Sequence, residues 1–180
     1  MENIQPLIDY GHVHFGENKV QEAVDKWTGV KDSSKMIKLH MVGKLQTNKV
    51  KFVIPLFDYI HSLDNIKLAE KISKEQNKLN KHLKIFIQVN IGSENQKNGI
   101  GSYSLKDFYN ICVNEFNLNI IGLMCIPPQH NIEKYFTEMY KLKTMLNLKE
   151  LSMGMSADYL QAAKCGSSFV RIGSKIFGNR

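Results

Sequence analysis

Short β-rich runs alternate with helical patterns along the whole chain, and no hairpin signal joins two of the runs. The β-rich runs are His12–Phe15, Met36–Val42, Tyr59–Leu63, Lys84–Asn90, Ile120–Ile126, Glu150–Met153 and Ser168–Gly173. The helical patterns between them are Lys19–Trp27, Asn48–Phe57, Ile66–Asn80, Leu105–Phe116, Ile132–Leu146 and Asp158–Cys165. Strands that alternate with helices pair in parallel through right-handed crossovers. The sequence therefore predicts an α/β fold with a parallel sheet.

The open question is whether this sheet is an open, doubly wound one or a closed (β/α)8 barrel. The run Lys84–Asn90 is apolar on both faces, as a buried parallel strand is. Ile4–Tyr10 is typical of the end of a helix closed by Gly11, and no strand precedes it. We therefore expect seven strands, with a first strand missing and a gap between His12–Phe15 and Ser168–Gly173.

Length and composition indicate one ordinary globular domain over residues 1–180. Of the 180 residues, 43% are hydrophobic and 23% charged, which excludes a disordered or collagen-like chain. No apolar run approaches the roughly 18 residues of a membrane span, and Met1–Tyr10 is not typical of a secretory signal. Three cysteines lie far apart without metal-ligand spacing. We expect reduced thiols in a cytoplasmic protein.

The formal charge of +7 raises the question of nucleic-acid binding. The 24 basic residues comprise 22 lysines, spread along helical stretches beside acids, and two arginines. This pattern favours a solvated helical surface, so we expect no specific nucleic acid and no membrane partner. Arg171 is different, because it lies inside an apolar strand, where planar multi-donor chemistry suggests a specific role.

Two segments at predicted strand ends give the sharpest functional signal. Ser152–Ser156 joins a strand to a helix, and Arg171–Ser174 ends the last strand. Exposed amides at a helix start, together with serine hydroxyls, suit a phosphate. In a barrel, a phosphate site often uses the loops after the last two strands. A simple serine cap with a turn glycine remains an equal alternative, because no Walker or GxGxxG pattern is present.

Other polar residues give weaker signals. His12 and His14 share a face of one strand, but no carboxylate or cysteine completes a metal site, so we expect no metal. His40 lies in an apolar strand, where a hydrogen-bonded core histidine is favoured over a ligand contact. Glu17 and Glu22 at one helix start favour a helix-dipole role over acid–base chemistry.

Six segments in order along the chain resemble one known family. They are HFGENKVQEAVDK from His14, LHMVGKLQTNK from Leu39, IHSLD from Ile60, IQVNIGSENQKNGI from Ile87, IIGLMCIPP from Ile120, and LSMGMSADYLQAAKCGSSFVRIGSKIFGNR from Leu151. Together they resemble the pyridoxal phosphate homeostasis proteins, the YggS/PROSC-like family. The match extends over essentially the whole chain.

The resemblance implies a single (β/α)8 TIM barrel of the alanine racemase N-terminal-domain type, lacking its first strand here. It implies pyridoxal 5'-phosphate (PLP) as the cofactor and vitamin B6 homeostasis as the function, without catalysis. Ser152, Ser156 and Gly173 would hold the phosphate, Arg171 would face the pyridine nitrogen, and Asn18 would lie near the ring. The full set of implied cofactor contacts is Asn18, His40, Ser152, Gly154, Ser156, Arg171 and Gly173.

The chain departs from the family pattern in two places. Leu39 and Met41 flank His40 where the family has aromatic residues. The family's Schiff-base lysine, at the end of its first strand, has no counterpart in the sequence given. We therefore expect no catalytic residue, weak PLP binding with a doubtful covalent link, and self-association of a family otherwise monomeric. The alternatives are a PLP-dependent racemase-like enzyme, or a truncated product with impaired PLP binding.

Overall fold

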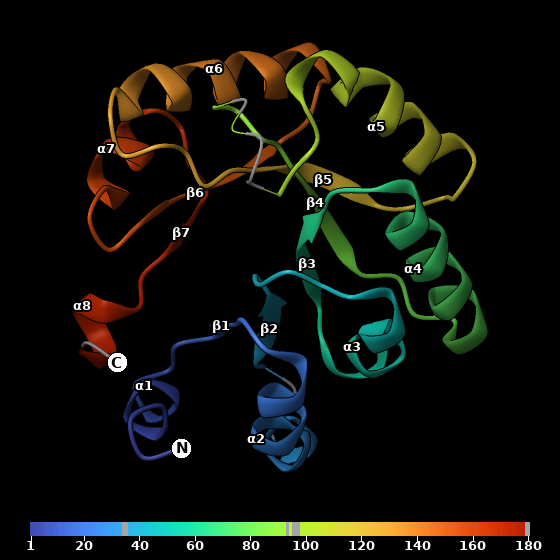
Figure 1. The fold of residues 1–180 in the computed structure, drawn as a ribbon. Helices are drawn as coiled ribbons and strands as arrows, with labels where there is room; N and C mark the ends of the chain where they lie inside the picture. Colours follow the sequence, from blue (N-terminus) through green and yellow to red (C-terminus); the bar gives the residue numbers. More distant parts are fainter. Residues whose placement is uncertain (34–35, 93, 95–97, 179–180) are drawn as a thin grey trace.

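The computed structural model describes residues 1–33, 36–92, 94 and 98–178, and Figure 1 shows its strands surrounded by helices. The strands are β1 (His14–Glu17), β2 (Lys38–Met41), β3 (Tyr59–Leu63), β4 (Lys84–Gln88), β5 (Ile120–Met124), β6 (Glu150–Met155) and β7 (Phe169–Arg171). The α-helices are α1 (Gln5–Asp9), α2 (Val20–Ser33), α3 (Val50–Leu56), α4 (Ile66–Leu79), α5 (Leu105–Asn114), α6 (Ile132–Met145), α7 (Tyr159–Lys164) and α8 (Ser174–Phe177). Short 3-10 turns, Thr47–Lys49 and Ser102–Ser104, precede α3 and α5.

The seven strands form one parallel sheet in sequence order, from β1 to β7. Within the described residues β1 and β7 are the two edges and do not pair with each other. The sheet is therefore a nearly closed barrel with its opening between the first and last strands, as the alternation predicted. An open sheet with a central reversal of strand order is excluded. Self-association through these edges stays a prediction.

The ends of several elements differ from the sequence-based expectations. Helix α2 continues past Trp27 to Ser33 and includes Gly29, which the pattern treated as lying beyond the helix. A glycine weakens a helix without ending it when flanking residues pack well. Helix α8 was not predicted at all, because its four residues are too few to show a periodic pattern. The helix expected to close at Gly11 is present as α1, which ends at Asp9, and Gly11 has a φ of +92°.

Two apolar clusters stabilise the barrel from its two sides. The larger one joins the sheet to the surrounding helices and includes Trp27, Ile72 and Phe136, all fully buried. The smaller one, inside the barrel, contains Tyr59 and Phe86 with Met124 and the partly buried Phe169. Because successive side chains of a strand point to opposite faces, one strand contributes to both clusters.

Two acidic side chains, buried Glu17 and partly exposed Asp58, attach the first helices to the first strands. Glu17 at the end of β1 accepts hydrogen bonds from the Trp27 indole at 2.6 Å and from Lys26 at 2.8 Å. Asp58 accepts from the Lys31 amine at 2.6 Å and from the Leu39 amide at 2.8 Å. Glu17 lies in β1 and not at a helix start as expected, and its contacts connect β1 to α2.

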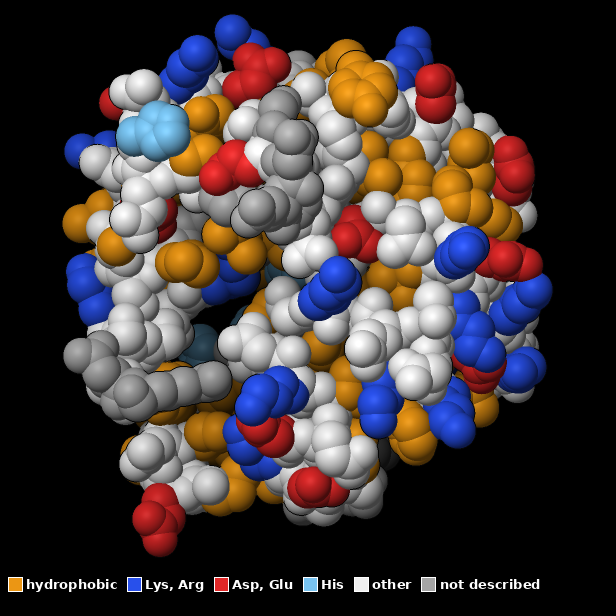
Figure 2. Space-filling model, viewed as in Figure 1, with side chains coloured by type: hydrophobic (Ala, Val, Ile, Leu, Met, Phe, Trp, Pro, Cys, Tyr) orange, Lys and Arg blue, Asp and Glu red, His pale blue; other side chains and the backbone are white. Residues whose placement is uncertain are grey.

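The molecular surface mixes lysines with acids, as Figure 2 shows for one face. On α4, Lys74 pairs with Glu70, and near the start of α2, Lys19 pairs with Glu22 at 2.6 Å, with all four side chains largely exposed. This is the solvated helical surface that the lysine pattern favoured. In the described part of the chain, no helix has the length and apolar character needed to cross a membrane.

Gly122 and Gly29 provide a matched test of the sheet packing. A Cβ built on Gly122 would lie 2.2 Å from the Glu150 carbonyl oxygen of the neighbouring strand, whereas one on exposed Gly29 would meet no atom within 4 Å. We expect Gly122→Ala to lower the free energy of unfolding by about 3 kcal/mol, as overpacking does. Gly29→Ala should raise it by about 0.5–1 kcal/mol through helix propensity. Urea unfolding followed by circular dichroism measures both, and equal effects of the two substitutions would contradict the close strand approach.

Candidate functional site

The Arg171 guanidinium connects the carboxyl ends of three neighbouring strands. Its Nη1 donates to the backbone oxygen and to the hydroxyl of Ser152, both at 2.8 Å, and its Nη2 donates to the Cys125 backbone oxygen at 2.8 Å. Arginine has five N–H donors, and within the described residues Nε and the second Nη2 hydrogen have no partner. No carboxylate in that part of the chain pairs with this cation. Burial lowers the pKa of Arg171 below its usual value, yet the group stays charged.

The loops after β6 and β7 meet beside Arg171. The Gly173 amide donates to the Ser156 hydroxyl at 3.2 Å, and a Cβ on Gly173 would meet no atom within 4 Å. Gly154 has a φ of +92°, and a Cβ there would lie 2.5 Å from the Ala162 Cβ on α7. Glycine is therefore required at position 154, because only it permits this turn and the close packing of α7.

The structure brings some of the predicted site residues together and gives others different surroundings. Ser156 and Gly173 lie within hydrogen-bond distance of each other, and their role toward a phosphate stays a prediction. Ser152 is fully buried, and its hydroxyl contacts Arg171 and His61. Its role toward the phosphate stays a prediction. Asn18 follows β1 and is exposed. Its backbone packs closely against Gly43, because a Cβ on Gly43 would lie 2.1 Å from the Asn18 backbone oxygen.

A row of hydrogen-bonded histidines crosses the barrel interior from β1 to β6. His14 Nδ1 lies 2.9 Å from His40 Nε2, His40 Nδ1 lies 2.9 Å from His61 Nε2, and His61 Nδ1 lies 2.8 Å from the Ser152 hydroxyl. We call His14, His40, His61 and Ser152 the histidine chain. The sequence pattern singled out His12, His14 and His40 but not His61, and it gave no sign that His14, His40 and His61 meet, although each of the first three β-rich runs contains at least one histidine.

Burial keeps the inner histidines of this chain uncharged. Desolvation, followed by the neighbouring His14, lowers the pKa of His40 to about 3. Desolvation, His40 and Arg171 together lower the pKa of His61 well below its usual value of 6.5. For His14 desolvation and His12 lower the pKa. Both ring nitrogens of His40 are bonded to other histidines, so the structure favours the core role over the predicted cofactor contact, which stays untested.

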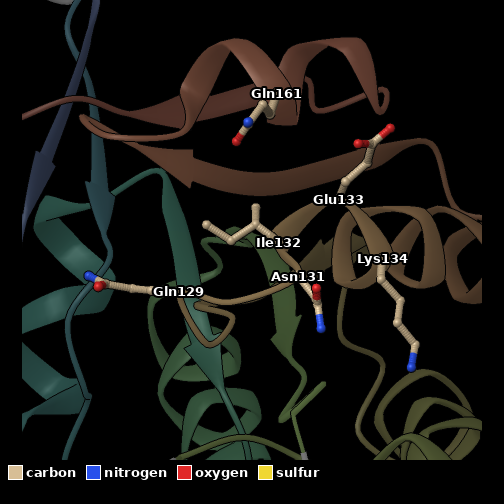
Figure 3. A pocket seen from close by; sticks show the side chains of 6 residues that line it. All are labelled: Gln129, Asn131, Ile132, Glu133, Lys134 and Gln161. Carbon is tan, nitrogen blue, oxygen red and sulfur yellow. The ribbon is translucent and has the colours of Figure 1, made fainter.

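The hollow that Figure 2 shows lies between β7 and β1 as drawn in Figure 1, and basic and histidine side chains are visible in its depth. Arg171 lies on β7, and His14, the outer end of the histidine chain, lies on β1. A separate depression of about 590 Å³ lies between the start of α6 and α7. Figure 3 shows Gln161 reaching from α7 toward Ile132 there, with Glu133 and Lys134 pointing apart. None of the predicted cofactor contacts lines it. The described residues hold no group of three His, Cys, Asp or Glu side chains suited to a metal ion.

Comparison with known proteins shows the family to which this chain belongs. The family described as alanine racemase, N-terminal domain, matches residues 1–180. Pyridoxal phosphate homeostasis proteins from Aquifex aeolicus and Pasteurella multocida are each 36% identical to the chain, which matches over 99% and 100% of its length and covers 82% of each relative. The chain belongs to the pyridoxal phosphate homeostasis protein family.

Solved structures of family members have the same fold. PipY of Synechococcus elongatus PCC7942 superimposes with a TM-score of 0.91 at 31% identity, covering 98% of this chain and 87% of PipY. A second PipY structure, with PLP bound, gives a TM-score of 0.88 at the same identity. Alanine racemase of Clostridium difficile 630 is only 11% identical, with a TM-score of 0.76 over 99% of this chain and 48% of the racemase. This last likeness shows the shared barrel alone.

The neutral histidines of this family member make its stability dependent on pH. The pKa of His40 is about 3 in the folded protein, against an ordinary value of 6.5. As the pH is lowered through 6.5, the unfolded chain therefore binds more protons than the folded protein does, and the free energy of unfolding decreases. His40 alone should reduce it by about 2 kcal/mol between pH 7.5 and pH 5. Urea unfolding across this range measures the slope.

Two glutamine variants control for this effect. His40→Gln should flatten the slope, whereas His82→Gln, at an exposed histidine, should leave it unchanged. An equal slope in wild type and His40→Gln would contradict a neutral, buried His40.

Proposed function

We propose that this chain binds PLP at the carboxyl ends of β5, β6 and β7 and acts in the cytoplasm as a non-catalytic carrier in PLP homeostasis. The observation that supports this most strongly is the Arg171 guanidinium, fixed by three hydrogen bonds and left with two unused donors. A half-buried cation without a carboxylate partner suits a ligand that offers a lone pair or a negative charge. The pyridine nitrogen and the phosphate of PLP offer both.

The residues present fit PLP in two respects. Arg171 would face the pyridine nitrogen. The Ser156 hydroxyl, which accepts from the Gly173 amide, would donate to the phosphate, and Gly173 has open space on the side where a Cβ would project. Gly154 and Asn18 complete the proposed set, Gly154 by turning the chain into this loop. Ser152 contributes through Arg171, because its buried hydroxyl accepts a hydrogen bond from the guanidinium. PLP itself supplies an electron sink when it is bound.

Arg171 also explains why a carrier, rather than a catalyst, is proposed. A permanent positive charge beside a pyridine nitrogen disfavours protonation of that nitrogen. An unprotonated ring withdraws electrons weakly, which suits storage of PLP better than chemistry on it. The names of the matching family members describe PLP homeostasis and state no catalytic activity.

Removing the Arg171 cation tests the proposed site. Arg171→Met should weaken PLP binding by about 10–100-fold, because a hydrogen bond to a charged group contributes about 1.5–3 kcal/mol. Lys149→Met removes one charge at an exposed position before β6 and should leave binding unchanged. Equilibrium dialysis of each purified variant with PLP, followed by its absorbance, gives the dissociation constants.

Three further readouts make this test decisive. Circular dichroism of each variant confirms the fold, so that lost binding is not lost structure. Equal PLP affinity in wild type and folded Arg171→Met would refute the proposed site. Turnover of L-alanine to D-alanine by the PLP-loaded wild type would replace the carrier function with the racemase-like alternative. Borohydride reduction with peptide mapping would show whether any lysine of this chain forms a covalent bond to PLP, and we expect no such adduct.

A further inference from the structure

Arg171 determines which partner the Ser152 hydroxyl proton has. The Ser152 oxygen accepts a hydrogen bond from Arg171 Nη1 at 2.8 Å, and a guanidinium accepts none. The other polar atom within reach of that hydroxyl among the described residues is His61 Nδ1, at 2.8 Å. Ser152 is fully buried, so no solvent molecule replaces this acceptor without entering the core. The hydroxyl must therefore donate to His61 Nδ1.

This assignment fixes the protonation of every ring behind it. A neutral imidazole that accepts at Nδ1 carries its proton at Nε2. His61 Nε2 then donates to His40 Nδ1 at 2.9 Å, and His40 Nε2 donates to His14 Nδ1 at 2.9 Å. The sequence of donors thus runs from Arg171 outward to exposed His14, without a break in the alternation of donor and acceptor.

We propose that His61 and Ser152 are positioning residues for Arg171, in a chain whose three imidazoles are neutral and protonated at Nε2. The role rests on the proposed function, since it is Arg171 that would meet the pyridine nitrogen. With its proton committed to His61, the Ser152 oxygen keeps its lone pairs for Arg171. The guanidinium is thereby held in one orientation, with its Nε and remaining Nη2 hydrogen unused.

The surroundings of the rings maintain this arrangement. His61 stacks on Phe86 with centroids 4.3 Å apart, and His40 stacks on Tyr59 at 4.0 Å. The positive charge of Arg171 lowers the pKa of His61. Lys31 and Lys84 lower the pKa of His40, whereas the negative charge of Asp58 raises it. His14 is influenced by His12, Lys38 and Lys84 and, with opposite sign, by Asp58. Positive neighbours outnumber the one acid, which favours uncharged rings.

The histidine chain does not carry protons out of the site. A proton could move outward only if the group donating to Ser152 released one, and a guanidinium does not do so near neutral pH. The arrangement is therefore static, and its effect is on orientation.

Histidine tautomers measured by long-range ¹H–¹⁵N NMR on the full, PLP-free chain test the proposal directly. Of the six histidines, we expect His14, His40 and His61 to show the neutral Nε2-protonated pattern from pH 8 to pH 6. In Arg171→Met the Ser152 oxygen is free to accept from His61, so His61 should become a mixture of tautomers. A merely structural role of Arg171 would leave the tautomers unchanged.

Matched variants then connect the chain to PLP binding. His61→Phe retains an aromatic ring against Phe86 but leaves the Ser152 proton without an acceptor, so PLP affinity should fall about fivefold. His14→Phe alters only the far end of the chain and should change affinity less than twofold. Where Arg171→Met does not fold, Ser152→Ala removes the hydroxyl alone and should randomise the His61 tautomer.

The possible failures are distinguishable. Protonation of His61 at Nδ1 in the wild type, or unchanged tautomers in both folded Arg171→Met and Ser152→Ala, would overturn the positioning role whatever the PLP affinities are. Equal losses of affinity in His61→Phe and His14→Phe would also overturn it. If the tautomers are as expected in the wild type and in Arg171→Met, but Arg171→Met binds PLP as tightly as the wild type, the proposed PLP site is refuted instead.

Discussion

The attachment of the Arg171 side chain to β5 and β6 is the interaction on which the rest of the site depends. A guanidinium taken out of water is costly unless its donors find partners, and here the partners are two backbone oxygens and a serine hydroxyl. Because these acceptors lie on neighbouring strands, one side chain fixes the last strand against the two before it. Strand β7 has only three residues, so such a side-chain attachment adds substantially to its few backbone bonds.

The interior of the barrel reflects the same requirement. An ordinary barrel core is filled with branched apolar side chains, whereas this one contains three imidazoles and a serine that bond one another. Buried polar groups of this kind are tolerable when every member is satisfied. Stacking on Tyr59 and Phe86 lets the rings contribute apolar contact as well, so the interior is both packed and polar.

The alternation of β-rich and helical runs was enough to predict the parallel sheet, its seven strands and the opening between the first and last. Arg171 also stood out, because a lysine-rich sequence had placed an arginine in an apolar strand. The histidine chain was not predictable in the same way. Its members lie on different strands, 26, 21 and 91 residues apart, and only strand register and twist bring their nitrogens together. Ser152 shows the same limit, since the motif assigned it to a phosphate site, whereas its buried hydroxyl contacts His61 and Arg171.

The alternation of donor and acceptor along the histidine chain has an evolutionary consequence. Replacing one interior member by an apolar residue leaves its two neighbours with an unmatched nitrogen or hydroxyl in a buried place, which costs more than the single bond lost. Replacing all members together by well-packed apolar residues removes that penalty. Positions 14, 40, 61 and 152 should therefore vary as a set among relatives rather than one at a time, and a redesigned barrel interior would have to exchange them in a single step.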